Sequence, residues 1–549
     1  MSCHSLTTPI TPVNLARVQT MNSHRRIFLK QLGLGLGGLS SLLSFPAGLR
    51  AEPLVHGKLP RSSPEAQGVR SEGILSFLQA IAASKHEFHS FIMVRRGHVI
   101  AEGWWSPYQA ELNHMLYSLS KSFTSTAIGL ARTEDKLTVD DPVTSFFPDK
   151  LPADISDNLR ALKIKHLLTM SVGHEKDSTP SITKEDDWVK TFLALPIGHQ
   201  PGTEFLYNSG ATYMLSAIVQ KVTGQKVIDY LTPRLFVPLG IDGMTWETCP
   251  HGINTGGWGL SLKTESLAKF GQLYLQRGSW NSRQLLPAKW VEEATTFKIQ
   301  QPAQDLEKQK LESDWHQGYC YQFWRCRHNA FRGDGAFGQY TIVMPEQEAV
   351  IAITSESPSM QGEMNLIWEH LLPAMQQGSV PANKQAAEEL NHTLQSLALA
   401  PAKGNVSSST ASRVSGKPFV VESNTAGVQN IAFQFAPDTC KFTLRDASSS
   451  YDITCGLEKW VRGETTMPGT PPKLTKRVGI NKSKVAASGT WKDDQTFEMT
   501  WRFIETPHHE TVTCRFSGDE IKVEYLNSIA QLSPSRKEER PQLVGRISS

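Results

Sequence analysis

The spacing of hydrophobic residues in this chain changes several times between residues 60 and 375. Residues 88–105 have apolar positions on both sides of Arg96-Gly97, which predicts two strands joined by a turn. A second apolar strand pair is predicted over 339–355, around a turn at Glu346-Gln347. Between and after these pairs, apolar residues at helical spacing predict helices over 118–137, 164–175, 209–224, 264–280 and 364–375.

The composition changes to Gln, Ala, Asn and Ser from residue 376 to residue 416, which predicts a linker that is helical in part around 384–398. Short stretches of alternating apolar residues follow. They predict a separate all-β domain over 417–530 and a polar tail over 531–549. The predicted strands of this domain are 430–435, 441–446, 496–503, 511–516 and 521–526.

The first fifty residues have the charge order of an export signal. Arg25, Arg26 and Lys30 precede an uncharged run that reaches Arg50, and Ala51 offers a small residue for cleavage. "RRIFLK" closely resembles the twin-arginine motif, which is an address read by a receptor. The glycine-rich run is only mildly apolar, so it is a poor bilayer-spanning helix. We therefore expect residues 1–51 to be a twin-arginine export signal of a periplasmic protein; an uncleaved membrane anchor is the alternative.

The composition is that of a soluble globular protein, with 39% hydrophobic and 20% charged residues among 549. This length suits two or three domains. A formal net charge of +3 gives no sign of the basic surface that nucleic-acid binding needs. The seven cysteines match no zinc-binding spacing and leave the disulfide state open.

Ser118 and Lys121 stand three residues apart at the start of a predicted helix. A serine hydroxyl is a weak nucleophile and needs a base within hydrogen-bonding reach. A lysine three residues further along a helix lies on the same face, and burial can lower its pKa enough for it to accept a proton. Taken alone, the pair is weak evidence, because most Ser-x-x-Lys sequences belong to ordinary helices with a solvated lysine.

Two further segments have residues suited to acyl transfer. Tyr207, Asn208 and Ser209 follow a turn and precede a helix, so the phenol could relay a proton to a leaving group. A core aromatic with Asn208 or Ser209 as the helix cap is the alternative. Glycines at 333, 335 and 338 suit a strand that lies against substrate, or simply a tight hairpin.

Together, in this order and spacing, these segments resemble the serine β-lactamase and penicillin-binding-protein superfamily over roughly residues 60–375. The likeness is to the class C-like branch of D-aminopeptidases, family VIII esterases and 6-aminohexanoate-dimer hydrolases. It implies an α+β fold, with an antiparallel sheet flanked by helices and an all-α lobe. No cofactor and no metal is implied.

The resemblance assigns roles by motif. Ser118 would be the acylated nucleophile, Lys121 its base and Tyr207 the motif tyrosine, with Ser209 at the usual asparagine position. Gly333 and Gly335 would line the substrate, and Ala336, on the following strand, would supply the second oxyanion amide. "GGWGL" at 256–260 is expected near the cleft.

The third motif departs from the family pattern. Gly333-Asp334-Gly335 stands where the family has Lys-Thr-Gly or His-x-Gly, whose cation meets a substrate carboxylate. Arg332 and His328 are possible substitutes. The sequence therefore predicts a serine hydrolase of a small-molecule ester, amide or peptide, with a broad esterase or amidase favoured over a lactamase or carboxypeptidase. The alternative is a catalytically impaired relative that binds peptidoglycan or a partner.

The β domain has no catalytic motif. His508, His509 and Glu510 invite a metal hypothesis, but no third ligand at regular spacing supports it, so a polar turn between strands is favoured. Trp460, Trp491 and Trp501 are expected in the domain core; glycan binding by exposed tryptophans is the alternative.

Overall fold

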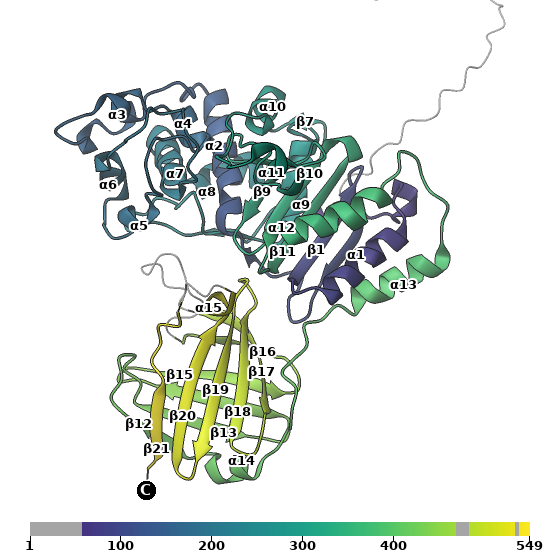
Figure 1. Cartoon of the computed structure of the whole chain (residues 1–549), viewed down its shortest axis with the longest axis vertical. Coiled ribbons are helices and arrows are strands. Elements are labelled where there is room, and N and C mark those ends of the chain that lie inside the picture. Colours follow the sequence, from purple (N-terminus) through teal and green to yellow (C-terminus); the bar gives the residue numbers. More distant parts are fainter. Residues whose placement is uncertain (1–56, 468–481, 533–536, 549) are drawn as a thin grey trace, which may run out of the picture. The chain divides into compact units, whose positions relative to one another are not determined.

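The computed structural model describes residues 57–467, 482–532 and 537–548. These belong to one compact unit. The predicted export signal lies outside the described residues. Figure 1 shows a sheet covered by helices and a second, strand-rich domain formed by the C-terminal residues. The expected α+β class with a C-terminal all-β domain is confirmed.

The main sheet is antiparallel and has six strands in the order β2-β1-β11-β10-β9-β8. Both predicted strand pairs are present: β1 with β2, and β10 with β11. The bounds are β1 Glu87–Arg95, β2 His98–Trp104, β8 Trp324–Arg325, β9 Phe331–Gly335, β10 Gln339–Met344 and β11 Ala349–Glu356. The first and last strands of the hydrolase segment therefore pair at the centre of one sheet.

Alternating residues of β1 bury opposite faces of this sheet. Ile92 and Val94 belong to the core that includes α2 (Ser120–Thr133) and α9 (Thr264–Leu275). Phe91 and Met93 belong to the other core, with α1 (Ser71–Ala83) and α12 (Met360–Leu366). β1 is therefore buried on both faces along nearly its whole length.

A helical lobe lies between β2 and β9 in the sequence, as the resemblance implies. Its main helix, α7, begins where the Asn208 side chain accepts a hydrogen bond from the Ala211 amide, and it ends at Gly224 with φ of 71°. The helices are α3 Asp157–Ala161, α4 Ile164–Leu168, α5 Thr179–Ile182, α6 Trp188–Ala194, α7 Ser209–Thr223 and α8 Val227–Leu231.

The predicted linker over 376–416 is more ordered than its composition suggests. The expected helix is present as α13, Lys384–Gln395. Ala386 and Leu390 of α13 are buried in the same core as α1. A second short helix, α14 (Ser409–Val414), buries Val414 in the β-domain core. This segment is therefore packed against both sheets and is not a free spacer.

The C-terminal strands form a ten-stranded sheet that closes on itself where β15 also pairs with β17. Trp491 and Trp501 are fully buried in its core, and Trp460 is half-buried. The strands are β12 Pro418–Val421, β13 Asn430–Phe435, β14 Thr439–Arg445, β15 Ser450–Leu457, β16 Val461–Thr465, β17 Ser483–Trp491, β18 Thr496–Phe503, β19 His509–Ser517, β20 Glu520–Asn527 and β21 Leu543–Ile547.

The expectation of a polar tail over 531–549 is wrong. β21 lies within this range and pairs with both β12 and β20. Its pattern was hidden by the charged residues before it, and Leu543 is buried while Val544 is half-buried. The β domain therefore extends to Ile547.

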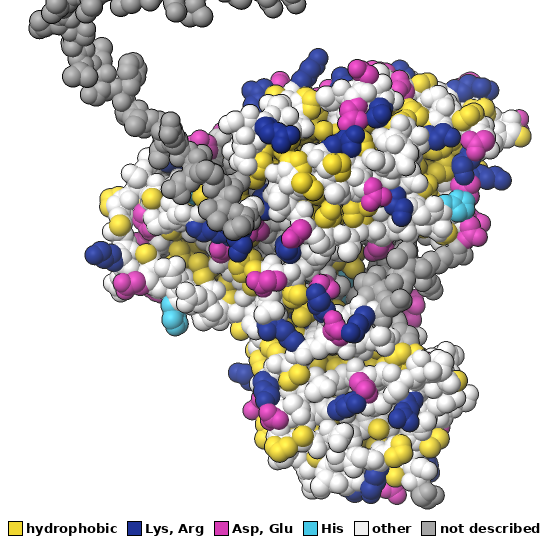
Figure 2. Space-filling view, turned by 180° about the vertical axis from the view of Figure 1, so that it is seen from behind, with side chains coloured by type: hydrophobic (Ala, Val, Ile, Leu, Met, Phe, Trp, Pro, Cys, Tyr) yellow, Lys and Arg dark blue, Asp and Glu magenta, His cyan; other side chains and the backbone are white. Residues whose placement is uncertain are grey.

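Charged side chains of both signs are interspersed on the face drawn in Figure 2. This agrees with a net charge of only +3. No helix in the part of the chain that the structure describes is long and apolar enough to cross a membrane.

Candidate active site

The predicted nucleophile lies in a short turn just before α2. Ser118 is half-buried in the 3-10 turn η3 (Tyr117–Leu119), one turn before Lys121. The turn lies close against β9. A Cβ added at Gly335 would lie 2.0 Å from the Leu116 carbonyl oxygen, and one at Gly333 would lie 2.6 Å from Ser122 Oγ. The two glycines are therefore required for the approach of β9 to the nucleophile.

Lys121 is positioned as a base for Ser118. Its side chain is 2% exposed. Its Nζ lies 3.1 Å from Ser118 Oγ, 2.9 Å from Ser209 Oγ and 2.7 Å from the Gly257 carbonyl oxygen. Burial lowers the pKa of Lys121 to about 7, although the negative charges of Asp177 and Asp334 act to raise it. A neutral amine has two N–H bonds and one lone pair, so donation to Ser209 and Gly257 leaves the lone pair for the Ser118 proton.

Tyr207 and Ser209 complete the group that the motifs predict. Tyr207 stacks on Trp324, and Lys121 Nζ lies 4.9 Å from the centre of the Tyr207 ring. Burial raises the pKa of Tyr207, and so does Asp334, while a hydrogen bond with Ser118 opposes the rise. The phenol therefore stays protonated at neutral pH and can donate a proton.

Asn208 faces away from this group. Its side chain caps α7 and bonds Ser178 and His174. The capping alternative is thus correct for Asn208, while Ser209 contacts the lysine. Gly257 places the "GGWGL" segment at the site, as expected.

Sequence reasoning missed two carboxylates. Asp177 accepts a hydrogen bond from the Ser209 amide at 3.1 Å. Asp334 affects the pKa of both Lys121 and Tyr207. Burial raises the pKa of Asp334 itself, while Arg332 and Lys121 oppose the rise. Asp334 was visible within the third motif, but nothing in the sequence placed Asp177 beside Ser209.

Neither proposed substitute for the missing cation is free to act as one. Arg332 is fully buried; its Nε bonds Asp334 at 2.9 Å, and its Nη1 bonds the Asp314 carbonyl oxygen at 2.8 Å. His328 lies exposed in the turn between β8 and β9, beside Trp368, at the end of β9 opposite to Gly335. The third motif therefore supplies no free cation here: Gly333 stands at the cation position, and Asp334, which follows it, is paired with Arg332.

Ala336 was expected on a strand. It lies instead in the turn between β9 and β10. It directly follows Gly335, which lies against Leu116 and Tyr117. The amides of Ser118 and Ala336 thus belong to two neighbouring segments. Their action as an oxyanion hole remains a prediction.

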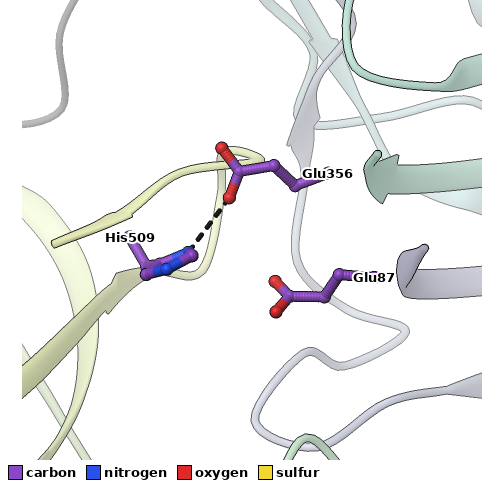
Figure 3. A group of neighbouring side chains, drawn as sticks. All are labelled: Glu87, Glu356 and His509. Atoms are coloured by element: carbon purple, nitrogen blue, oxygen red, sulfur yellow. Dashed lines mark hydrogen bonds and ion pairs between the residues drawn. The ribbon is translucent and has the colours of Figure 1, made fainter. Parts of the chain in front are cut away.

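His508 and Glu510 are buried and His509 is half-buried, which the expectation of a polar turn did not include. His509 lies near two carboxylates of the hydrolase segment, Glu356 and Glu87 (Figure 3). These carboxylates are already paired. Arg502 makes two hydrogen bonds to Glu87, and Glu356 accepts hydrogen bonds from His508, His509 and Ser528. A cation here would face the Arg502 guanidinium, so the group is better described as an ion-pair network than as a metal site.

The fold and the Ser-Lys-Tyr geometry define a serine hydrolase. The sequence profile of the beta-lactamase family matches residues 88–374, which is more than half of the chain. The protein therefore belongs to the beta-lactamase family, as the motifs predicted.

Similarity to individual proteins is lower. The chain is 24% identical over 291 residues to the 6-aminohexanoate-dimer hydrolase of Paenarthrobacter ureafaciens, covering 49% of this chain and 72% of that protein. It is 32% identical over 113 residues to the lovastatin esterase of Penicillium rubens, covering 18% of this chain and 27% of that esterase. A solved structure, the octameric penicillin-binding protein homologue from Pyrococcus abyssi, aligns over 86% of this chain and 99% of its own, with 14% identity and a TM-score of 0.44. The chain is thus a hydrolase homologous to enzymes that cleave esters and amides.

Proposed function

We propose that this protein is an exported serine hydrolase that cleaves a small-molecule ester or amide through an acyl-enzyme on Ser118. The observation that supports it most is the contact of Lys121 Nζ with Ser118 Oγ at 3.1 Å, made by an amine whose pKa is lowered to about 7. Serine catalysis at neutral pH needs a base of this kind.

In the first step, Ser118 Oγ attacks the substrate carbonyl carbon while its proton passes to Lys121 Nζ. The carbonyl oxygen becomes an oxyanion, held by the amides of Ser118 and Ala336. The bond to the leaving oxygen or nitrogen then breaks as that atom takes a proton from Tyr207, which recovers one from Lys121. A water molecule attacks the acyl carbon in the second half, releasing the acid and restoring the Ser118 hydroxyl.

The substrate is expected to lack a carboxylate at the position that meets β9. Gly333 stands at the position of the family's cation, and the neighbouring Arg332 is already bound to Asp334 and to the Asp314 carbonyl oxygen. A substrate carboxylate would therefore find no free cation to pair with. Neutral or cationic esters and amides are therefore favoured over β-lactams and peptides ending in D-alanine.

A fluorophosphonate probe tests the nucleophile. Wild-type protein should be labelled at Ser118, Ser118→Ala should lose the label, and Ser122→Ala should keep it as a neighbouring-serine control. Retained labelling in Ser118→Ala would refute the assignment. A wild-type protein that neither takes the label nor hydrolyses p-nitrophenyl butyrate would instead support the non-catalytic alternative.

The location is a separate part of the proposal. Arg25, Arg26 and the apolar run that follows support export to the periplasm by the twin-arginine route. Replacement of both arginines by lysine should retain the protein in the cytoplasm, as measured by cell fractionation. Unchanged export of that variant would refute the route.

A further inference from the structure

The turn between β18 and β19 brings residues of the β domain beside the nucleophile. The Glu505 carbonyl oxygen accepts a hydrogen bond from the Met115 amide at 2.9 Å, and the Thr506 carbonyl accepts one from the Tyr108 hydroxyl at 3.1 Å. His508 follows and is fully buried. Its Nε2 bonds the hydroxyl of Tyr117, the residue directly before Ser118.

The orientation of His508 is set from its other side. Its Nδ1 lies 2.7 Å from Glu356 Oε1. Burial alone would raise the pKa of Glu356, but the hydrogen bonds from His508 and His509 bring it to about 2, so the carboxylate is ionised at neutral pH. An ionised carboxylate accepts a hydrogen bond from an N–H at Nδ1, and the bond to Glu356 turns Nε2 of the ring toward the Tyr117 hydroxyl.

The two residues next to the predicted oxyanion amides both have unusual backbone conformations. Tyr117 precedes the Ser118 amide and has φ of 49°, and Phe337 follows Ala336 and has φ of 69°. A non-glycine residue in this left-handed region needs surrounding structure to hold it there. His508 contacts both: its ring centre lies 4.9 Å from that of Phe337 and 5.8 Å from that of Tyr117.

We propose that His508 is a positioning residue for the hydrolase reaction: it holds Tyr117 and Phe337 in their left-handed conformations and so fixes the Ser118 nucleophile and both oxyanion amides. The β domain thereby completes the active site without touching the reacting atoms. This inference rests on the proposed function, because it concerns the same nucleophile.

Two substitutions at His508 separate its two hydrogen bonds. His508→Asn places an amide near Nδ1 and keeps the bond to Glu356, but it cannot reach Tyr117. His508→Gln places an amide near Nε2 and keeps a partner for Tyr117. We expect His508→Asn to lower kcat for p-nitrophenyl butyrate about tenfold with KM within twofold, and His508→Gln to stay within threefold of wild type.

Tyr117→Phe removes the same bond from the hydrolase side. It should resemble His508→Asn, and the double variant should be no slower than the slower single variant, because both changes break one interaction. His509→Gln is the matched control. It alters the other bond to Glu356, at 3.0 Å, and leaves the contacts of His508 with Tyr117 and Phe337 in place, so it should stay within twofold.

Thermal unfolding of each variant identifies loss of folding, and Tyr117→Phe carries the test if His508→Asn does not fold. Three results would overturn the inference while leaving Ser118 catalysis intact. The first is an equal loss of kcat in His508→Asn and His508→Gln, and the second is an equal loss of kcat in His509→Gln. The third is an unchanged kcat in both His508→Asn and Tyr117→Phe. A wild-type protein without turnover or Ser118 labelling would overturn the proposed function, and the inference with it.

Discussion

The pKa of Lys121 predicts how activity depends on pH. The neutral amine is the proposed base, and burial lowers its pKa from 10.5 to about 7. Activity should therefore rise as pH increases, with a midpoint near 7. Asp177 and Asp334 favour the protonated amine, so they raise this midpoint. Asp177→Asn removes one negative charge but keeps an oxygen that can accept from the Ser209 amide, and it should move the midpoint to lower pH.

The sizes of these effects follow from burial and exposure. The drop from 10.5 to about 7 is 3.5 pH units, or about 5 kcal/mol in favour of the neutral amine. Asp177 is exposed, and solvent and salt screen its charge. Its removal should shift the midpoint by about half a unit, which makes Asp177→Asn about threefold faster than wild type well below the midpoint.

The assay is kcat/KM for p-nitrophenyl butyrate between pH 5 and 9, at low and high salt. Asp154→Asn, an exposed aspartate elsewhere in the lobe, is the control and should keep the wild-type midpoint. The shift in Asp177→Asn should shrink at high salt. A midpoint that stays in place or moves to higher pH in Asp177→Asn would refute the electrostatic account of the base, and a wild-type profile flat from pH 5 to 9 would refute Lys121 as the titrating group.

Four further predictions concern Tyr207, β9, the thiols and the cost of burying Lys121. Tyr207→Phe should lower kcat about 10²–10³-fold with little effect on thermal stability, because it removes only the proton donor; a loss below tenfold would contradict that role. Gly335→Ala should lower Tm and abolish probe labelling, because its Cβ would lie 2.0 Å from the Leu116 oxygen, whereas Gly463→Ala, with no neighbouring atom within 4 Å, should do neither. Six cysteines in the described residues are unpaired and buried, so they should react with a thiol reagent only in denaturant; reaction of several thiols in the native protein would contradict this. The pKa of Lys121 is lower in the native state than in the unfolded chain, so the unfolded chain binds more protons between pH 7 and 10.5. The free energy of unfolding of the wild-type protein therefore rises across that range as the cost of burying this lysine disappears. Lys121→Met should therefore raise the free energy of unfolding by about 1–3 kcal/mol at pH 7 and below, with the gain lost by pH 10.5, as urea titration would measure.

The sequence predicted those parts of the site that depend on local spacing. Ser118 and Lys121 are one helical turn apart, so their contact follows from the backbone alone. Gly335 was predicted to lie against substrate, but in the structure it lies against the Leu116 carbonyl, a partner far away in sequence. Helices and strands with clear periodicity, such as α7 and β1, were likewise predictable.

The remaining contacts depend on tertiary packing that no periodic pattern encodes. His508 is 391 residues from the tyrosine it binds, and its neighbours in the sequence suggest only a turn. Asp334 was visible, but its pairing with Arg332, which removes that cation from substrate binding, depends on both side chains lying on one face of β9. β21 was missed because charged residues precede this short strand, which gains its stability from two flanking strands, β12 and β20.

The pairing of β21 with β12 has a consequence for biosynthesis. β12 is made first among the strands of its sheet and β21 last, so one edge of β12 has no neighbour until the ribosome has completed nearly the whole β domain. An open strand edge invites association with other chains, and closure removes that risk. If His508 fixes the nucleophile as inferred, hydrolytic activity also depends on this late closure, so nascent chains would stay inactive until β21 has been made.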